Sequence, residues 1–513
     1  HFLYHFKIFK FIRKKKIKFF FFSSNINKKK MTIVSSNLTS GFIDLATYDE
    51  LEKYMYGGAD ATAYFVRATR RSTWFTQVPV VLSRASGTPG FSQDWSVSIS
   101  RAGDYLLYTW LRIVLPPITA VPAFCSKRDG RDVKIDTYVA WSPNLMHNLI
   151  REAAITFNDL VAARFDNYQL DFWSAFTTPA GKQVGYLNMI GMTDDLIVPK
   201  KALPAKTLNL PLPFFYSRDS GVALPTAALP YNDMRLQFSF RTYTELIVAY
   251  DYITYKDTNE SIVVSRVPVV ADFGSAFPEI TSVQVWGNYA LVSNDERKRM
   301  ACAPRDILIE QVQTAPIQSY NPFQNPNQSY DIRFSHAIKV LFFAVQNVTV
   351  PSSWSNYTTR ETVAVSKNVA EDSLVIESFF PGSDPIGETS LIYENTQRLA
   401  QMGSDYFSLV QPYYAAPVIP VQCGYHSYSY SLDFMCLDPL GSTNYGKLTN
   451  VSIIPSASVE ARFVAEPKNL IAAAVGGDEI PAFQRAQIFR FIVTAVNNNI
   501  IRISGGALGF PVL

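Results

Sequence analysis

Apolar and polar residues alternate along much of the chain, and this pattern predicts strands more often than helices. The clearest case is residues 234–241, where Met, Leu, Phe and Phe alternate with Arg, Gln, Ser and Arg. A period of two places one face of a strand on a core and the other toward water or a neighbour. Residues 104–115 and 337–350 are long, aromatic and rich in β-branched side chains, as buried strands are.

Turn-forming residues divide these runs. Thirty prolines and 24 glycines are scattered through the chain, and they separate many short apolar segments. Short strands without regular helical insertions favour an all-β sandwich or jelly roll over an α/β enzyme. Helices are expected only locally, near residues 146–164 and 294–312.

Residues 31–60 are predicted to form an N-terminal arm with a short helix. Thr47 and Glu50 have the capping-box spacing, in which a hydroxyl and a carboxylate satisfy backbone N–H groups reciprocally. Gly57 and Gly58 are expected to end the helix. Three apolar side chains would share one helical face: Leu51, Tyr54 and Met55.

A weak internal duplication indicates two similar β-sandwiches. Residues 101–104 lead into one apolar run, and residues 335–339 lead into another about 235 positions later. Residues 289–292 and 494–496 each precede a polar turn and an Arg, with an offset of about 204. Loop insertions could supply the difference between the offsets. The predicted units are a first roll over 61–303 and a second roll with a C-terminal tail over 304–513.

Charge and composition narrow the class of protein. The chain has 513 residues, 48% of them hydrophobic and 18% charged, which excludes a disordered protein and suggests surface buried against partners. Residues 1–30 hold ten of the 47 basic side chains and no acidic one, so residues 31–513 carry 37 basic and 43 acidic side chains. A net charge of −6 over that body argues against direct nucleic-acid binding.

The leader over residues 1–30 has a composition unlike the rest. It begins with His1, the first Met is Met31, and Phe, Lys, Ile and Asn dominate it. These residues have codons rich in A and T. We therefore expect residues 1–30 to be the conceptual translation of an untranslated leader that is in frame with Met31, and not a native segment. The alternative is a basic arm that binds nucleic acid or anionic lipid. No apolar run approaches the roughly 18 residues that a membrane-spanning helix needs.

Candidate catalytic and cofactor motifs are weak. Asp219-Ser220-Gly221 resembles a serine-protease nucleophile segment, but we interpret it as a turn in which Asp and Ser bond the backbone and Gly takes a positive φ. The body has three histidines, none in a catalytic context: His147, His336 and His426. Gly505, Gly506 and Gly509 imitate a dinucleotide fingerprint without the helix it needs, so a flexible apolar tail that tucks into a groove is expected.

No cofactor or metal site is predicted. The four cysteines lack Cys-x-x-Cys spacing and are interpreted as buried thiols in a reducing compartment: Cys125, Cys302, Cys423 and Cys436. Six Asn-x-Ser/Thr sequons are expected to be mostly unmodified: Asn37, Asn259, Asn327, Asn347, Asn356 and Asn450. Catalytic, cofactor-binding and metal-ligating residues are therefore each predicted to be none.

Several collinear segments carry a more specific signal. They are residues 40–58, 100–107, 210–225, 229–235, 295–299, 331–339, 441–450 and 499–513. Together they resemble the major capsid protein of the nucleocytoplasmic large DNA viruses, of the iridovirus and ascovirus type. The resemblance spans nearly all of 31–513. The segments that match less well are expected to be loops: 248–280, 312–330, 360–388 and 456–484.

The resemblance implies a double jelly roll and a non-enzymatic structural protein of a virion capsid. It implies homotrimers of pseudo-hexagonal outline that tile an icosahedral shell over an internal membrane, with neighbouring capsomers and minor capsid proteins as partners and assembly in the host cytoplasm. The arm at 31–58 and the tail at 503–513 are expected to act as latches. The alternative is a jelly-roll carbohydrate-binding protein or glycosidase, which would need a carboxylate pair in an aromatic-lined cleft.

Overall fold

The structure is a computed structural model that describes most of the chain. The described residues are 32–56, 73–121, 127–128, 130–258, 260–302, 304–360, 362–378, 382–467 and 486–510. Residues 1–72 and 73–513 are two separate units, and each is described by itself. The predicted leader and Cys125 lie outside the described residues.

In the described part of the N-terminal unit, the chain forms helices α2 (Thr32–Ala46) and α3 (Glu50–Tyr56). The expected helix after Thr47 is confirmed as α3, but its predicted cap is wrong. The Thr47 hydroxyl donates to the carbonyl of Asp44 at 2.6 Å, so it closes the turn after α2. The Asp49 backbone N–H donates to the Glu52 carboxylate at 3.3 Å, which places the capping interaction two residues later than predicted.

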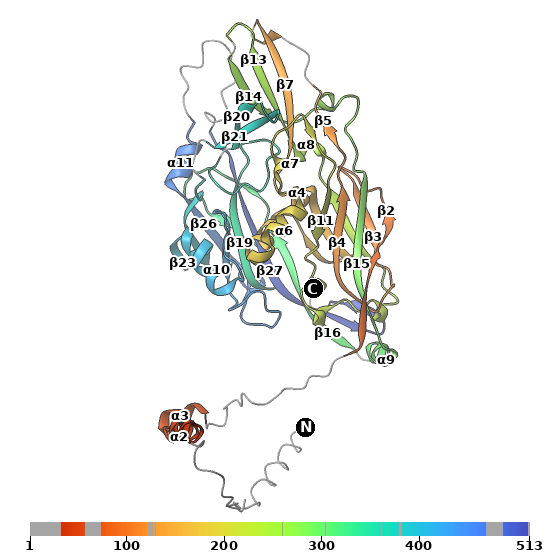
Figure 1. The fold of residues 1–513 in the computed structure, drawn as a ribbon, viewed down its shortest axis with the longest axis vertical. Helices are drawn as coiled ribbons and strands as arrows, with labels where there is room; N and C mark the ends of the chain where they lie inside the picture. The colour runs from red at the N-terminus through yellow and green to blue at the C-terminus, as the bar shows by residue number, and fades with distance from the viewer. Residues whose placement is uncertain are drawn as a thin grey trace, which may run out of the picture. The chain divides into compact units, whose positions relative to one another are not determined.

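Eight antiparallel strands between residues 75 and 292 form a first roll (Figure 1). In chain order they are β1 (Phe75–Val81), β3 (Asp94–Ser98), β4 (Tyr105–Val114), β8 (Ile150–Phe157), β9 (Leu160–Phe165), β11 (Thr207–Pro211), β12 (Met234–Phe240) and β15 (Ser282–Val292). Numbered one to eight, they pair as one sheet in the order 1-8-3-6 and another in the order 2-7-4-5. The short strand β2 (Ser83–Ser86) extends the second sheet at its edge.

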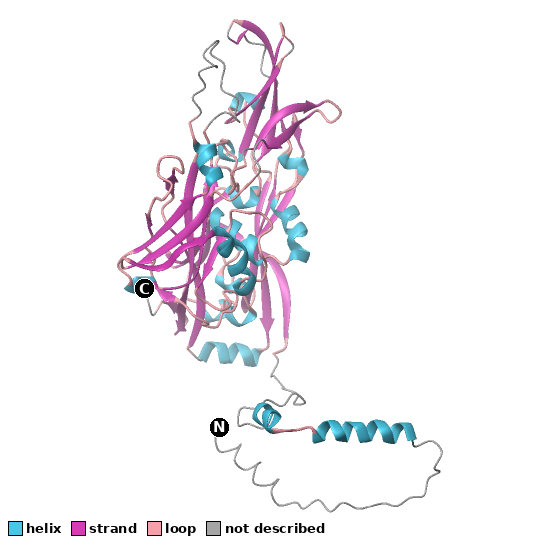
Figure 2. Ribbon diagram, turned by 90° about the vertical axis from the view of Figure 1, so that its left-hand side faces the viewer, coloured by secondary structure: helices cyan, strands magenta, loops and turns pink. Residues whose placement is uncertain are grey.

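A second roll repeats this order. Its strands are β16 (Arg305–Thr314), β18 (Tyr330–Asp331), β19 (Ala337–Asn347), β22 (Ile386–Tyr393), β23 (Thr396–Gly403), β24 (His426–Ser429), β26 (Val451–Ala457) and β27 (Phe489–Ser504). They again pair 1-8-3-6 and 2-7-4-5. Two sandwiches with this interleaved order form a double jelly roll, so the predicted fold class is confirmed. Strands dominate residues 73–510, and the helices are short (Figure 2).

The internal duplication follows the strand order. The two matched pairs of segments fall on the third strands, β4 and β19, and on the eighth strands, β15 and β27. Each third strand has a bulge opposite its eighth strand, after Leu106 in the first roll and after Ile338 in the second. Aligning the two bulges makes Trp110 equivalent to Phe342. One detail of the prediction is wrong, because residues 497–499 continue β27 and form no turn.

Three predicted strands are confirmed, and two predicted helices are largely wrong. Strands β12, β4 and β19 lie where the patterns placed them. The region 146–164 is helical only in α4 (Leu145–Leu149) and then forms β8 and β9. The region 294–312 is helical in α9 (Asn294–Cys302) and then forms β16. In both regions, pairing in a sheet overrides local helix formers.

Insertions of the first roll build an additional sheet at the end of the body drawn at the top of Figure 1. Its strands are β6 (Lys127–Arg128), β7 (Arg131–Trp141), β13 (Ile247–Tyr255) and β14 (Ser261–Arg266). The hairpin β20 (Thr362–Asn368) and β21 (Ser373–Ser378) lies beside β14. The expectation that 248–280 and 360–388 are loops is therefore wrong for these hairpins.

The remaining elements of the described residues are short. They are β5 (Ile118–Thr119), α5 (Asn167–Thr177), α6 (Ala180–Ile190), α7 (Asp194–Ile197), β10 (Ala202–Leu203), α8 (Tyr243–Leu246), β17 (Gln318–Tyr320), η5 (Tyr406–Val410), α10 (Gln411–Ala415), β25 (Thr443–Asn444), α11 (Val459–Ala465), β28 (Ala507–Gly509) and five short 3-10 turns. No helix among the described residues is long and apolar enough to cross a membrane.

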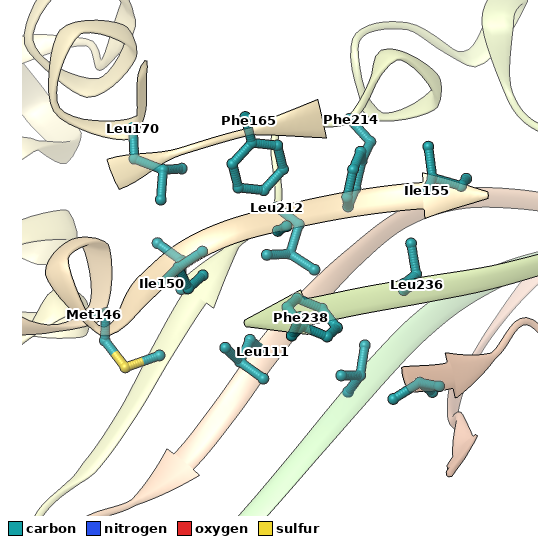
Figure 3. Packing of buried hydrophobic residues seen from close by; sticks show 14 of the residues in the cluster. Leu111, Met146, Ile150, Ile155, Phe165, Leu170, Leu212, Phe214, Leu236 and Phe238 are labelled. Carbon is teal, nitrogen blue, oxygen red and sulfur yellow. The ribbon is translucent and has the colours of Figure 1, made fainter. Parts of the chain in front are cut away.

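The first roll has a core that the second roll helps to complete. Figure 3 shows Leu111 of β4, Phe165 of β9 and Phe238 of β12 in one apolar interior. Four isoleucines from β16 and β27 belong to the same cluster: Ile307, Ile309, Ile501 and Ile503. The other half of β27 packs in the core of the second roll. This one strand therefore contributes to both rolls.

The chain's last described segment is a hairpin. Gly505 and Gly506 have φ of 61° and 81°, which glycine adopts without steric cost, and they turn β27 back onto β28. The Leu508 N–H donates to the Asn232 side chain at 3.0 Å, and Leu508 packs against the first core. The expected packing of the tail is confirmed, but the segment is a paired strand and not an irregular tail.

Candidate assembly surfaces

Helix α5 joins the two rolls. It lies between the fifth and sixth strands of the first roll, and the Asp166 carboxylate caps it by accepting from the Gln169 N–H at 2.9 Å. Leu170 points into the first core. Three aromatic residues spaced four apart face the second roll instead: Tyr168, Phe172 and Phe176. A period near 3.6 keeps these three on one side of the helix.

The surface that receives α5 is the outer face of the second roll's 1-8-3-6 sheet. Phe342 of β19 is completely buried there and stacks between Phe172 and Phe176, with ring centroids 5.8 and 5.3 Å away. Val340 and Ala344 flank it on the same face. Burying each aromatic side chain is worth roughly 2–3 kcal/mol, so this apolar joint contributes substantially to holding the rolls together.

A buried carboxylate fastens the same joint. Asp171 of α5 accepts from His147 at 2.7 Å in the first roll, and from Ser355 and Tyr357 at 2.8 Å in the second. The other ring nitrogen of His147 lies 2.6 Å from the Tyr186 hydroxyl. Burial and the Asp171 charge raise the pKa of Tyr186, so its hydroxyl stays protonated.

A second buried carboxylate binds two cations across the rolls. Glu310 of β16 pairs with Lys339 of β19 at 2.6 Å and with Arg218 of the first roll. The Arg218 guanidinium also lies 3.7 Å from the ring centroid of Trp173 in α5. Burial lowers the pKa of Arg218, and Glu310 opposes that shift. Removing one partner from such a group leaves a buried charge uncompensated.

The corresponding face of the first roll is open. On its 1-8-3-6 sheet, Trp110 of β4 lies directly opposite Trp286 of β15, with stacked rings 5.9 Å apart. Tyr108, 47% exposed, and Arg112 extend this surface along β4. Two hollows of about 780 and 580 Å³ meet at Tyr108 and Trp110. We call this surface the aromatic face.

The second roll carries an exposed helical segment at the position that α5 holds in the first. Elements η5 and α10 connect its fifth and sixth strands. Phe407 is buried in the second core, whereas Leu409, Tyr413 and Tyr414 are 52%, 70% and 79% exposed. We call these three residues the tyrosine helix.

The catalytic interpretation of Asp219-Ser220-Gly221 is not supported. The Asp219 carboxylate accepts from the Ser220 N–H at 2.8 Å and starts a single 3-10 turn, as the turn interpretation expected. The positive φ expected at Gly221 is wrong. Of the histidines, His147 belongs to the joint described above, and His426 pairs with Asp384 at 2.6 Å. The buried pairs at Asp171 and Glu310 were missed, because in the sequence a buried charge looks like a surface charge.

The cysteine prediction is wrong where it can be checked. Cys423 is exposed and Cys436 is half-buried, and both are free thiols. The side chain of Cys302 lies outside the part of the chain that the structure describes. Within the described part of the chain, no three His, Cys, Asp or Glu side chains gather as a metal ion would need.

Two sequons serve as local turns. Asn347 and Asn356 each accept hydrogen bonds from the backbone and hydroxyl of the Thr two positions later. Asn347 is buried and its amide donates to Thr358 and Gln487, so the folded chain cannot carry a sugar there. Asn327 and Asn450 are exposed, Asn37 lies on α2, and Asn259 is outside the described residues.

The arrangement of two tandem rolls places the chain in a class that includes known viral coat proteins. A quasi-atomic PBCV-1 virus capsid superimposes with a TM-score of 0.64 at 19% identity, over 88% of this chain and all of that one. The Faustovirus major capsid protein gives a TM-score of 0.60 at 10% identity, over 94% of this chain and all of that one. At such low identity these matches establish the fold alone.

Sequence comparison is more specific. The family "Major capsid protein N-terminus" matches residues 63–292, and "Large eukaryotic DNA virus major capsid protein" matches 296–509. The major capsid proteins of Costelytra zealandica iridescent virus and Invertebrate iridescent virus 6 are 57% identical, each over 94% of this chain and all of the relative. That of Lymphocystis disease virus 1 is 46% identical over the same shares. The chain belongs to the major capsid proteins of large eukaryotic DNA viruses, of the iridovirus type, and is a structural protein of the virion capsid and not an enzyme.

Proposed function

We propose that the chain forms homotrimeric capsomers of pseudo-hexagonal outline that tile an icosahedral shell over an internal membrane. The repeated strand order carries this proposal, because each chain brings two similar sandwiches. Three copies then present six similar corners, and a shell can be tiled with nearly uniform contacts between capsomers. Each such contact can be weak, since many act at once.

The native mass of the purified chain, measured by sedimentation over a range of concentrations, tests the proposal. A trimer that persists on dilution is expected, because interfaces that survive dilution are large and apolar. A monomer at every concentration would contradict the capsomer.

The N-terminal arm is proposed to latch a capsomer to neighbouring capsomers or minor capsid proteins. Helices α2 and α3 expose Phe42, Leu45 and Leu51 by 63%, 73% and 65% of their area. Deleting residues 31–58 should leave trimers intact and impair shell assembly. Normal shells from the deleted chain would contradict this role. The C-terminal segment to residue 510 is less suited to a latch, because its hairpin is bonded within the chain.

The boundary between the rolls is proposed to lie near residue 303, between α9 and β16. No strand before this point pairs with one after it among the strands of the four roll sheets. Assembly in the host cytoplasm is also proposed, since the free thiols Cys423 and Cys436 suit a reducing compartment.

A further inference from the structure

The joint between the two rolls is formed by a helix on the outer face of a 1-8-3-6 sheet, and the chain has a second, unpaired helix and a second, open face of the same kind. We propose that the tyrosine helix of one copy seats on the aromatic face of a second copy. This inference rests on the proposed homotrimer and names the surfaces that would form it.

The two helical segments have matching patterns. In α5, Leu170 enters its own core, while residues two and six positions later, Phe172 and Phe176, face the other roll. In η5–α10, Phe407 enters its own core, and residues two and six positions later are Leu409 and Tyr413. Both segments connect the fifth and sixth strands of a roll. Leu409 and Tyr413 thus correspond to the residues that α5 uses in the joint.

The two receiving faces match as well. The equivalent bulges in β4 and β19 align Trp110 with Phe342, the ring that stacks between Phe172 and Phe176. Trp110 and Trp286 lie at the centre of the aromatic face in one chain, with Tyr108 half exposed beside them. A helix with Leu409 and Tyr413 on its outer side would cover this face as α5 covers Phe342.

The aromatic face is continuous with the existing joint. The larger hollow is lined on one side by Tyr108 and Trp110 and on the other by Trp173 and Arg218, and both of the latter also belong to the joint between the rolls. A helix in this hollow would extend an apolar contact that already exists.

The charges at the two surfaces are also complementary. Arg112 on the aromatic face bonds the neutral amide of Gln284 at 3.4 Å. Asp405 stands exposed at the start of η5, and its side chain makes no cap bond there. Among the residues that the structure describes, no carboxylate lines either hollow of the aromatic face. A cation on one surface and an anion at the end of the other favour the pairing.

Such a contact is heterologous, because it joins two different surfaces of identical chains. Heterologous contacts close into rings or continue as filaments. A closed trimer would have three contacts between copies, alternating with the three joints inside the chains. In all six places, the connection between the fifth and sixth strands of one roll would pack on the 1-8-3-6 sheet of another roll. The tyrosine helix would then be buried in every subunit.

Two double variants of the full chain test this arrangement. Tyr108→Asp with Arg112→Glu alters the aromatic face, and Tyr413→Asp with Tyr414→Asp alters the tyrosine helix. Each variant alone should raise the concentration at which trimers dissociate by roughly a hundredfold or more, as loss of interface anchors does. Val459→Asp, at a residue that is 85% exposed on α11 and belongs to neither surface, should leave the trimer unchanged.

Mixing the two variants gives the sharpest result. The variant altered on the aromatic face keeps a normal tyrosine helix, and the variant altered on the tyrosine helix keeps a normal aromatic face. Only one contact in the mixture therefore joins two unaltered surfaces: the tyrosine helix of the first variant on the aromatic face of the second. An equimolar mixture should therefore form 1:1 dimers and no trimers. Near-ultraviolet circular dichroism checks that each variant is folded. If the double Asp variant of the tyrosine helix loses the native spectrum, the double variant Tyr413→Ser with Tyr414→Ser is used in its place.

The outcomes separate the two proposals. Trimeric wild type with fully trimeric variants would overturn this inference and leave the capsomer standing. Monomeric variants whose mixture forms no dimer would overturn the pairing of these two surfaces. A monomeric wild type would remove the proposed capsomer and this inference with it.

Discussion

The outer faces of the two 1-8-3-6 sheets share a topology and differ in chemistry. In the second roll, Val340, Phe342 and Ala344 are wholly apolar and buried beneath α5. In the first roll, the equivalent positions of β4 are Tyr108, Trp110 and Arg112. A face covered as soon as the chain folds can be fully apolar, whereas a face exposed to water needs polar groups at its edges. The chemistry of each face therefore matches its exposure in the single chain.

The largest effect is expected at the covered face. Phe342→Ala removes a ring that stacks on two others in a site with no exposed area. It should reduce the free energy of unfolding by about 3–5 kcal/mol, measured by urea denaturation of dilute protein. A loss below about 1 kcal/mol would show that α5 and β19 are only loosely packed.

A somewhat smaller effect is expected from the charges beside that face. Glu310→Gln leaves Lys339, only 1% exposed, without its ionic partner, and should cost about 3 kcal/mol in unfolding free energy. Asp306→Asn on the same strand is the matched control, because its pair with Arg502 is solvent-exposed. Equal effects of the two substitutions would contradict the role assigned to burial.

The open face should contribute less to the stability of one chain. Trp110→Ala removes a half-buried ring stacked on Trp286 and should cost about 1–2 kcal/mol in the unfolding of the monomer. Because the equivalent Phe342 is fully covered, Phe342→Ala should reduce the free energy of unfolding clearly more than Trp110→Ala in the same assay. Similar losses at the two positions would mean that the two faces do not differ as described.

The smallest effect is expected where the rolls meet at the surface. Hydrogen bonds from Lys367, then from Lys201 and Tyr138, lower the pKa of Asp372 in the folded chain. Its contribution is therefore present above the usual Asp pKa, near 3.9, and is lost as the pH falls through the lowered value. Asp372→Asn should cost below about 0.5 kcal/mol at pH 7, since the pair is exposed. In urea titrations at several pH values, the difference from wild type should vanish in acid; a difference that grows in acid would contradict the assignment.

Part of this architecture was predictable from the sequence. The alternation in 234–241 and the aromatic runs in β4 and β19 identified strands, because side-chain period and burial are local features. The duplication located equivalent strands even though the faces beside them differ. Residues 150–157 misled the prediction, because Arg, Glu and Ala favour helices while pairing with β12 and β9 holds them in a sheet.

The assembly surfaces could not be predicted in the same way. In the sequence, Trp110 and Phe342 both resemble core residues of a strand. Only the fold shows that Phe342 is covered by α5 and that Trp110 lies on an open face. Asp171 and Glu310 have bonding partners from distant parts of the chain. Such pairings depend on tertiary structure, and no local pattern records them.

Strand β27 has a consequence for biosynthesis. Ile501 and Ile503, near the end of the chain, fill the core of the roll whose first strand begins at Phe75. Domains made first usually fold first on the ribosome, yet this roll lacks part of its interior until Ile501 and Ile503 have left the exit tunnel. The nascent chain must therefore keep apolar surface of its first sandwich uncovered until these two residues can pack, and a chain cut before Ile501 would leave that sandwich unsealed.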